Sequence, residues 1–118
     1  FMLIGINGIE QDRQLILDRV RAVASLIRER GSRVYLGSIL PLRSPDAWNR
    51  FQYQGKIAGI NAEQKAWSEA NLDGFLDYHS RLKDDAGQLA AEYARPDGTH
   101  LTFAAYRVMA DLVRPFLA

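Results

Sequence analysis

The feature that most limits how this chain can fold is a strand–helix–strand pattern in its first 40 residues. Leu3–Ile6 is a short apolar stretch followed by the turn residues Asn7 and Gly8, which predicts a buried strand. Gln11–Arg30 carries apolar residues every three or four positions, which predicts a helix with one buried stripe. The stripe consists of Ile16, Val20, Val23 and Ile27. Arg33–Leu40 predicts a second strand, so the three segments form a βαβ unit, and such a unit implies a parallel sheet.

The remaining sequence continues the alternation of helices and strands. We expect a helix over Lys56–Asn71, a third strand over Phe75–Tyr78 and a last helix with Thr102 as its N-cap. The 118 residues suffice for one domain, and 47% hydrophobic and 25% charged residues are typical of a globular protein. The sequence therefore predicts a single α/β layer structure with three parallel strands.

Composition argues against several other classes of protein. The net charge is +1, without a basic run, so nucleic acid is a poor candidate partner. The sequence has no apolar run of the roughly 20 residues that span a membrane. With no cysteine and two histidines, it offers no recognisable zinc spacing. Gly5-x-x-Gly8 lacks the third glycine and the acidic residue of a dinucleotide-binding motif.

The sequence begins directly in its first apolar stretch. Phe1–Ile4 has no polar lead-in and no signal-peptide layout. A strand that is apolar on both faces needs a neighbour on each edge, and an open edge of this kind is unusual. We therefore expect a preceding segment, or another chain, to cover the free edge of this strand.

Polar residues that could take part in catalysis or binding follow the predicted strands. Asn7 follows the first strand, Ser38 lies near the end of the second, and Asp97 and His100 share a loop before the last helix. In an open parallel sheet these positions meet at the carboxyl edge, where ligands bind. A carboxylate on one imidazole nitrogen leaves the other nitrogen free as a general base. On spacing alone, Asp97-x-x-His100 is better explained by a surface accident or a helix-entry hydrogen bond than by catalysis.

Four segments together resemble the SGNH/GDSL family of ester hydrolases. Asp97-Gly98-Thr99-His100-Leu101-Thr102, with Ala105-Tyr106 beyond it, resembles the last conserved block of the family, D-G-x-H-(L/P)-(T/N/S). Leu3–Asn7 is similar to the block in which an apolar strand leads into G-x-N-D. The stretches 36–41 and 76–78, with Leu82 and Gly87 downstream of the latter, are similar to the two strands between these blocks. The resemblance covers essentially the whole chain, in the family's order.

This resemblance implies a fold, an activity and three site residues. The family has a flavodoxin-like three-layer α/β/α fold with five parallel strands, and it hydrolyses esters and thioesters through a serine. His100 would be the base, Asp97 would orient it, and the Asn7 amide would donate to the oxyanion. The family's G-D-S serine block lies upstream of the G-x-N-D strand and has no counterpart in residues 1–118. Gly8 stands where the family usually has Asp or Asn.

Other candidate residues are weaker. Ser38 lacks a strand-to-helix elbow, so a local hydrogen bond explains it better than a nucleophilic role. His79 follows the third strand, and Asp77 should point to the opposite face, so we interpret it as a partly exposed loop histidine. The aromatic residues of the loop after the second strand either line a substrate pocket or cap the core. They are Trp48, Phe51 and Tyr53.

The sequence therefore predicts the C-terminal portion of one SGNH hydrolase domain over residues 1–118. We expect a serine esterase acting on a small-molecule ester (an acyl ester or an acetylated carbohydrate), with its nucleophile on an N-terminal segment outside these residues. No metal or organic cofactor is implied. Two alternatives remain: a non-catalytic relative that binds acylated or carbohydrate ligands, and an interaction module that pairs its open edge with a partner chain.

Overall fold

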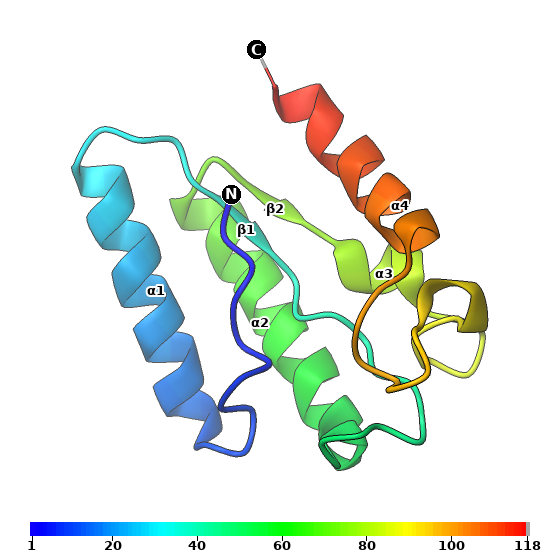
Figure 1. The fold of residues 1–118 in the computed structure, drawn as a ribbon. Helices are drawn as coiled ribbons and strands as arrows, with labels where there is room; N and C mark the ends of the chain where they lie inside the picture. The colour runs from blue at the N-terminus through cyan, green and yellow to red at the C-terminus, as the bar shows by residue number, and fades with distance from the viewer. Residues whose placement is uncertain (118) are drawn as a thin grey trace.

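Between residues 13 and 76 helices and strands alternate as the sequence predicts (Figure 1). The structure is a computed structural model, and it describes residues 1–117. In chain order the elements are α1 (Arg13–Glu29), β1 (Tyr35–Gly37), η1 (Phe51–Tyr53), α2 (Gln54–Asn71), β2 (Gly74–Leu76), α3 (Tyr78–Leu82), η2 (Ala91–Tyr93), α4 (Phe103–Val113) and η3 (Arg114–Phe116).

Helix α1 begins and ends at local signals in the sequence. The Asp12 side chain caps the helix by accepting the Leu15 N–H at 3.0 Å, and Gly31 has the positive φ (92°) common just after a helix. The predicted stripe is confirmed only at its N-terminal end, because Val23 and Ile27 are 46% and 36% exposed. The buried residues of the helix are Ile16, Leu17, Val20 and Ala24.

The two strands form a parallel sheet. Tyr35 pairs with Gly74, and Gly37 pairs with Leu76. The N-terminal segment adds one parallel bridge, at Met2: its N–H donates to Tyr35 O at 2.9 Å, and its carbonyl accepts the Gly37 N–H at 2.7 Å. The parallel arrangement predicted from the βαβ pattern is therefore confirmed.

The prediction of a three-stranded sheet is not confirmed, because Leu3–Ile6 does not form a regular strand. In a parallel ladder every second residue of a strand bonds to the same neighbour. Beyond Gly37, the next residue that could bond to the first segment is therefore Ile39. Its N–H and carbonyl are instead bound by the Asn61 side chain, at 2.8 and 2.9 Å. The ladder therefore stops after Met2. The three-layer flavodoxin-like detail also remains an expectation.

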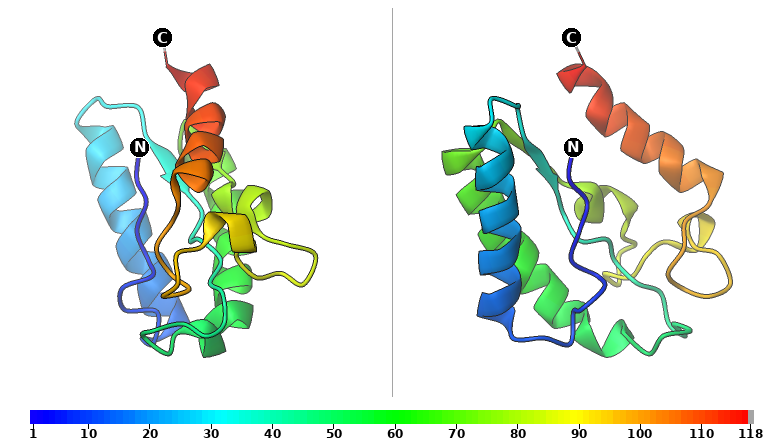
Figure 2. Two further views of the ribbon diagram at one scale, coloured as in Figure 1. Left: turned by 45° about the vertical axis from the view of Figure 1, so that its right-hand side comes forward. Right: turned by 60° about the vertical axis from the view of Figure 1, so that its left-hand side comes forward.

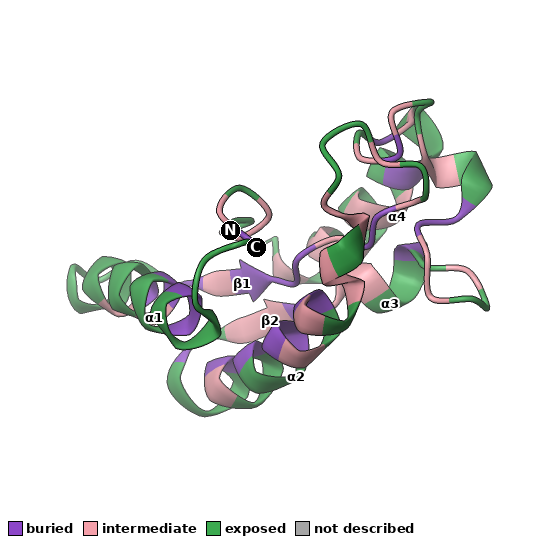
Figure 3. Cartoon of the chain, turned by 90° about the horizontal axis from the view of Figure 1, so that it is seen from below, coloured by how far each residue is buried: buried purple, intermediate pink, exposed green. Residues whose placement is uncertain are grey.

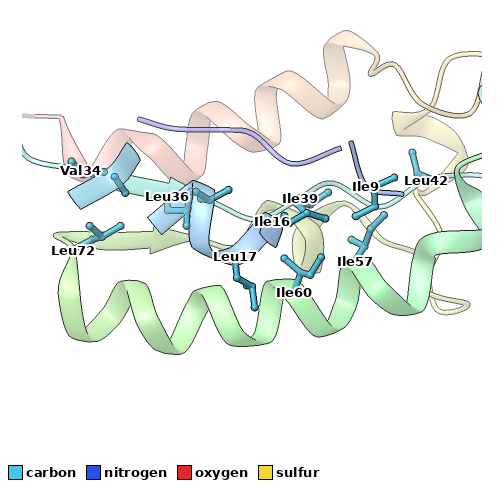
Figure 4. Close-up of a cluster of buried hydrophobic side chains, with 12 residues drawn as sticks. Ile9, Ile16, Leu17, Val34, Leu36, Ile39, Leu42, Ile57, Ile60 and Leu72 are labelled. Carbon is cyan, nitrogen blue, oxygen red and sulfur yellow. The ribbon is translucent and has the colours of Figure 1, made fainter. Parts of the chain in front are cut away.

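Apolar side chains form two clusters, one on each side of the strands. The first lies between the strands and the helix pair α1–α2, and Figure 4 shows Leu36 and Val34 above Ile60 and Leu17. The second joins Leu76 to α3 and α4. Figures 2 and 3 show α1 and α2 on one side of the strands and α4 on the other. Burying one such leucine or isoleucine stabilises the fold by about 1.5–3 kcal/mol.

Candidate active site

Asp97 and His100 lie in the turn between η2 and α4, and they contact each other directly. The His100 Nδ1 lies 2.7 Å from Asp97 Oδ2. The other carboxylate oxygen, Oδ1, accepts the backbone N–H groups of Thr99 at 2.9 Å and of His100 at 2.8 Å. Thr102 is the N-cap residue of α4, as predicted. The carboxylate therefore orders the turn and holds the imidazole ring at the same time.

The geometry assigns a different role to each ring nitrogen of His100. Backbone N–H bonds from His100 and Thr99, and then the side-chain bond from His100, lower the pKa of Asp97 to about 2. The carboxylate is therefore ionised at neutral pH and can only accept a hydrogen bond. In the neutral ring Nδ1 must carry the proton, which leaves Nε2 as a free base. The His100 side chain is 60% exposed, so Nε2 is accessible to a reacting group.

Replacement of Asp97 by asparagine is expected to lower stability in a pH-dependent way. Because folding depresses this pKa from 3.8 to about 2, the ionised carboxylate stabilises the fold above pH 3.8, and the effect is lost as the pH falls through about 2. Melting temperatures of the two proteins should therefore differ at pH 7 and converge towards pH 2. A difference in Tm that stays constant over this range would contradict the assignment.

Gly98 allows the Asp97–His100 turn to lie against the loop after β1. Its φ is +76°, and a Cβ at this position would lie 2.2 Å from Arg43 O and 2.6 Å from Pro45 O. The two loops are joined by hydrogen bonds from Arg43 N to Gly98 O at 2.8 Å and from Ala47 N to Asp97 O at 2.9 Å. Only glycine fits both the backbone conformation and the close approach.

Asp46 strengthens the contact between these loops. One of its carboxylate oxygens accepts the Thr99 hydroxyl at 2.8 Å, and the carboxylate also accepts backbone N–H groups of Trp48, Arg50 and Phe51. Burial raises the pKa of Asp46, but these hydrogen bonds lower it more, so the net shift is downward. The residue therefore anchors residues 46–51 beside the Asp97–His100 turn.

Asn7 lies in the turn between the N-terminal segment and α1. This turn lies at the same end of the molecule as the loop after β1 and the loop before α4 (Figure 1). It is exposed, and its Oδ1 accepts a hydrogen bond from Arg50 Nη1 at 3.1 Å. The Arg50 guanidinium lies over the Trp48 ring, 5.3 Å from the centroid, and the Trp48 ring meets the His100 ring edge-on at 5.3 Å and 72°. A chain of contacts thus connects Asn7 to His100.

An apolar hollow lies next to this group of residues. It has a volume of about 180 Å³, and Ile6 and Thr99, the neighbours of Asn7 and His100, both contribute to its wall. The other lining residues are Leu3, Ile4, Ile39, Leu40 and Leu42. The candidate site is therefore bordered by apolar side chains.

The structure separates Ser38 and His79 from this site. Ser38 is 1% exposed, and its hydroxyl accepts the N–H of His79, 41 positions away, at 2.8 Å. The hydrogen bond is therefore structural, but it is not the local bond that the sequence predicted. His79 lies in α3 and not in a loop after the strand, because the Asp77 side chain caps a short helix by accepting the Ser80 N–H. Burial, together with the charge of Lys83, lowers the pKa of the half-buried His79 ring.

The three loop aromatics have different positions. Phe51 and Tyr53 are partly buried against the α1–α2 core, whereas Trp48 is 52% exposed beside His100. The core-capping interpretation therefore holds for Phe51 and Tyr53. Trp48 lies beside His100 but does not line the apolar hollow, so its role in a substrate pocket stays a prediction. Sequence reasoning missed Arg50 and Asp46. The turn residues Ser44-Pro45-Asp46 indicate a loop, but they do not indicate which residues the loop contacts.

Residues 1–117 contain neither a cluster suited to a metal ion nor a helix suited to span a membrane. No three or more acidic or histidine side chains gather closely enough to hold a metal ion in this part of the chain. Among its helices, none combines the length and the apolar character needed to cross a membrane.

Solved structures that resemble this chain include a GDSL-like lipase and an acylhydrolase. A protein of Streptococcus pneumoniae, provisionally named a platelet activating factor, superimposes with a TM-score of 0.83 at 27% identity over 98% of this chain and 57% of its own. A provisionally assigned acylhydrolase of Bacteroides fragilis gives 0.80 at 27% identity, over 89% and 51% of the two chains. A GDSL-like lipase of Bacteroides thetaiotaomicron gives 0.85 at 24% identity, over 97% and 58%.

These comparisons confirm the resemblance to the SGNH/GDSL hydrolase family. No protein-family model and no curated protein sequence matches the chain. The chain spans 51–58% of the length of the three solved structures. Its likeness therefore extends over part of the molecules that it resembles.

Proposed function

We propose that residues 1–118 supply the acid–base and oxyanion groups of an SGNH/GDSL-type ester hydrolase, as the C-terminal portion of its single domain. The observation that carries the proposal is the Asp97–His100 pair, in which Nδ1 is held by an ionised carboxylate and Nε2 is exposed. The similarity to solved acylhydrolase and GDSL-like lipase structures supports the same class of reaction.

In the proposed mechanism a serine hydroxyl attacks the ester carbonyl and gives its proton to Nε2 of His100. Asp97 stabilises the imidazolium that forms, and the Asn7 amide donates to the oxyanion. The imidazolium then protonates the departing alcohol, which leaves an acyl-serine. His100 next removes a proton from water, whose attack releases the acid and restores the serine. These steps need no metal or organic cofactor.

We place the serine on a segment outside residues 1–118. Ser38 is buried and bonded to His79, and among the described residues no hydroxyl is hydrogen-bonded to the His100 Nε2. Exposed apolar side chains at the N-terminal segment suit packing by that serine-bearing segment or by another chain, as Phe1, Leu3 and Ile4 are 58%, 46% and 44% exposed. The substrate is a small-molecule ester, with either an acyl chain or an acetylated sugar.

Residues 1–118 alone are expected to show no esterase activity, whereas the full-length protein should hydrolyse p-nitrophenyl esters. A fluorophosphonate probe should label the full-length protein at a serine outside residues 1–118, because the probe needs an activated hydroxyl. Peptide mapping by mass spectrometry identifies the labelled residue. Turnover by residues 1–118 that disappears on Ser38→Ala would contradict the proposal, and so would a full-length protein that neither turns over esters nor reacts with the probe.

A further inference from the structure

The orientation of the Asn7 carboxamide is set by Arg50. Arginine has five N–H donors and no acceptor, so the carboxamide atom that faces its guanidinium must be the oxygen. Arg50 Nη1 lies 3.1 Å from Asn7 Oδ1, and this contact turns Nδ2 away from Arg50. Within residues 1–117 the Asn7 Nδ2 donates no hydrogen bond, and the residue is exposed. The N–H donors of Asn7 are therefore free to bind an oxyanion.

Arg50 is itself held by its own loop. Its guanidinium lies over the Trp48 ring at 5.3 Å, and the Asp46 carboxylate accepts its backbone N–H. Trp48 also touches the His100 ring, and Asp46 binds Thr99 next to it. The loop of residues 46–50 thus contacts both the predicted oxyanion donor and the predicted base.

We propose that Arg50 is a positioning residue that acts through Asn7, and this inference rests on the proposed function. A carboxamide without a partner rotates, and it presents its oxygen to the developing oxyanion in part of the population. An oxygen at that place repels the negative charge that Nδ2 is meant to stabilise. Fixed donors are effective because they need no reorganisation during the reaction. Arg50 keeps the N–H donors of Asn7 available. Through Trp48 it also holds the distance between Asn7 and His100.

A second arginine provides a matched control. Arg21 donates to the side-chain oxygen of Gln64 at 3.0 Å and lies over the Trp67 ring at 5.4 Å. These are the same two contacts that Arg50 makes, but they lie between α1 and α2, away from Asp97 and His100. Replacing Arg21 therefore removes a comparable contact without touching the candidate site.

The test is a double-mutant cycle in the full-length protein with a p-nitrophenyl ester. Arg50→Met is expected to lower kcat about tenfold with KM within about twofold, because the contact matters in the transition state. In the Asn7→Ala background the same change should lower kcat less than about twofold, since the partner is gone. Arg21→Met should leave kcat unchanged. An unchanged kcat in Arg50→Met, or an equal loss in both backgrounds, would overturn the inference.

Two further measurements keep the test independent of folding and of the proposed function. Arg50→Lys retains a positive donor and should have a kcat between those of Arg50→Met and the unsubstituted protein, and a folded lysine variant slower than Arg50→Met would contradict the role. NMR relaxation of the Asn7 side-chain amide should show faster internal motion in Arg50→Met. This measurement does not depend on esterase activity. A lack of esterase activity would refute the proposed function alone, whereas unchanged motion of the Asn7 amide in Arg50→Met would refute the role of Arg50.

Discussion

Replacement of His100 by alanine in the full-length protein is expected to lower kcat/KM for ester hydrolysis by about a thousandfold or more. The imidazole is the only proposed group that takes the proton from the serine, and a missing general base costs about 10²–10⁴ in rate or more when it acts together with the nucleophile. The fold should be retained, because the His100 side chain is 60% exposed. Steady-state kinetics and circular dichroism measure the two effects.

His79→Gln is the matched control for this experiment. His79 is the other histidine of the sequence, and it lies in α3 with its backbone bonded to Ser38. Its activity should stay within about twofold of that of the unsubstituted protein, as for a substitution away from the reacting atoms. Equal losses at both histidines, in folded proteins, would mean that the base has been assigned wrongly.

Replacement of Asn7 by alanine is expected to lower kcat about a hundredfold. An oxyanion donor is worth about 3 kcal/mol in acyl transfer and acts mainly in the transition state, so KM should change little. Thermal stability should also change little, because Asn7 is exposed and its side chain bonds to Arg50 and not to the backbone of its own turn. Kinetics and a thermal melt of the same preparation test both statements.

The competing interpretation of Asn7 makes the opposite prediction. Asparagine before Gly8 is a common turn residue, and the loss of a turn residue lowers Tm while the rate per folded molecule stays nearly intact. A less stable but fully active Asn7→Ala protein would refute the oxyanion role. Asp97 and His100 would then be the remaining predicted site residues.

The sequence by itself determined the features that depend on residues a few positions apart. The helical periodicity predicts α1, and Thr102 marks the start of α4. The Asp97–His100 contact is also local. Both residues lie in one turn, and the Asp97 carboxylate accepts the backbone N–H groups of residues two and three positions further on. Such local geometry follows from spacing and residue type.

Only the tertiary structure decided what depends on residues far apart. Pairing of the first segment stops at Met2 because Asn61, 22 residues from Ile39, takes the next backbone groups of the β1 segment. Arg50 reaches Asn7 across 43 positions, and Thr99 reaches Asp46 across 53. A spacing pattern contains no information on contacts of this range, because they exist only after the apolar faces of the helices and strands have packed and brought the loops together.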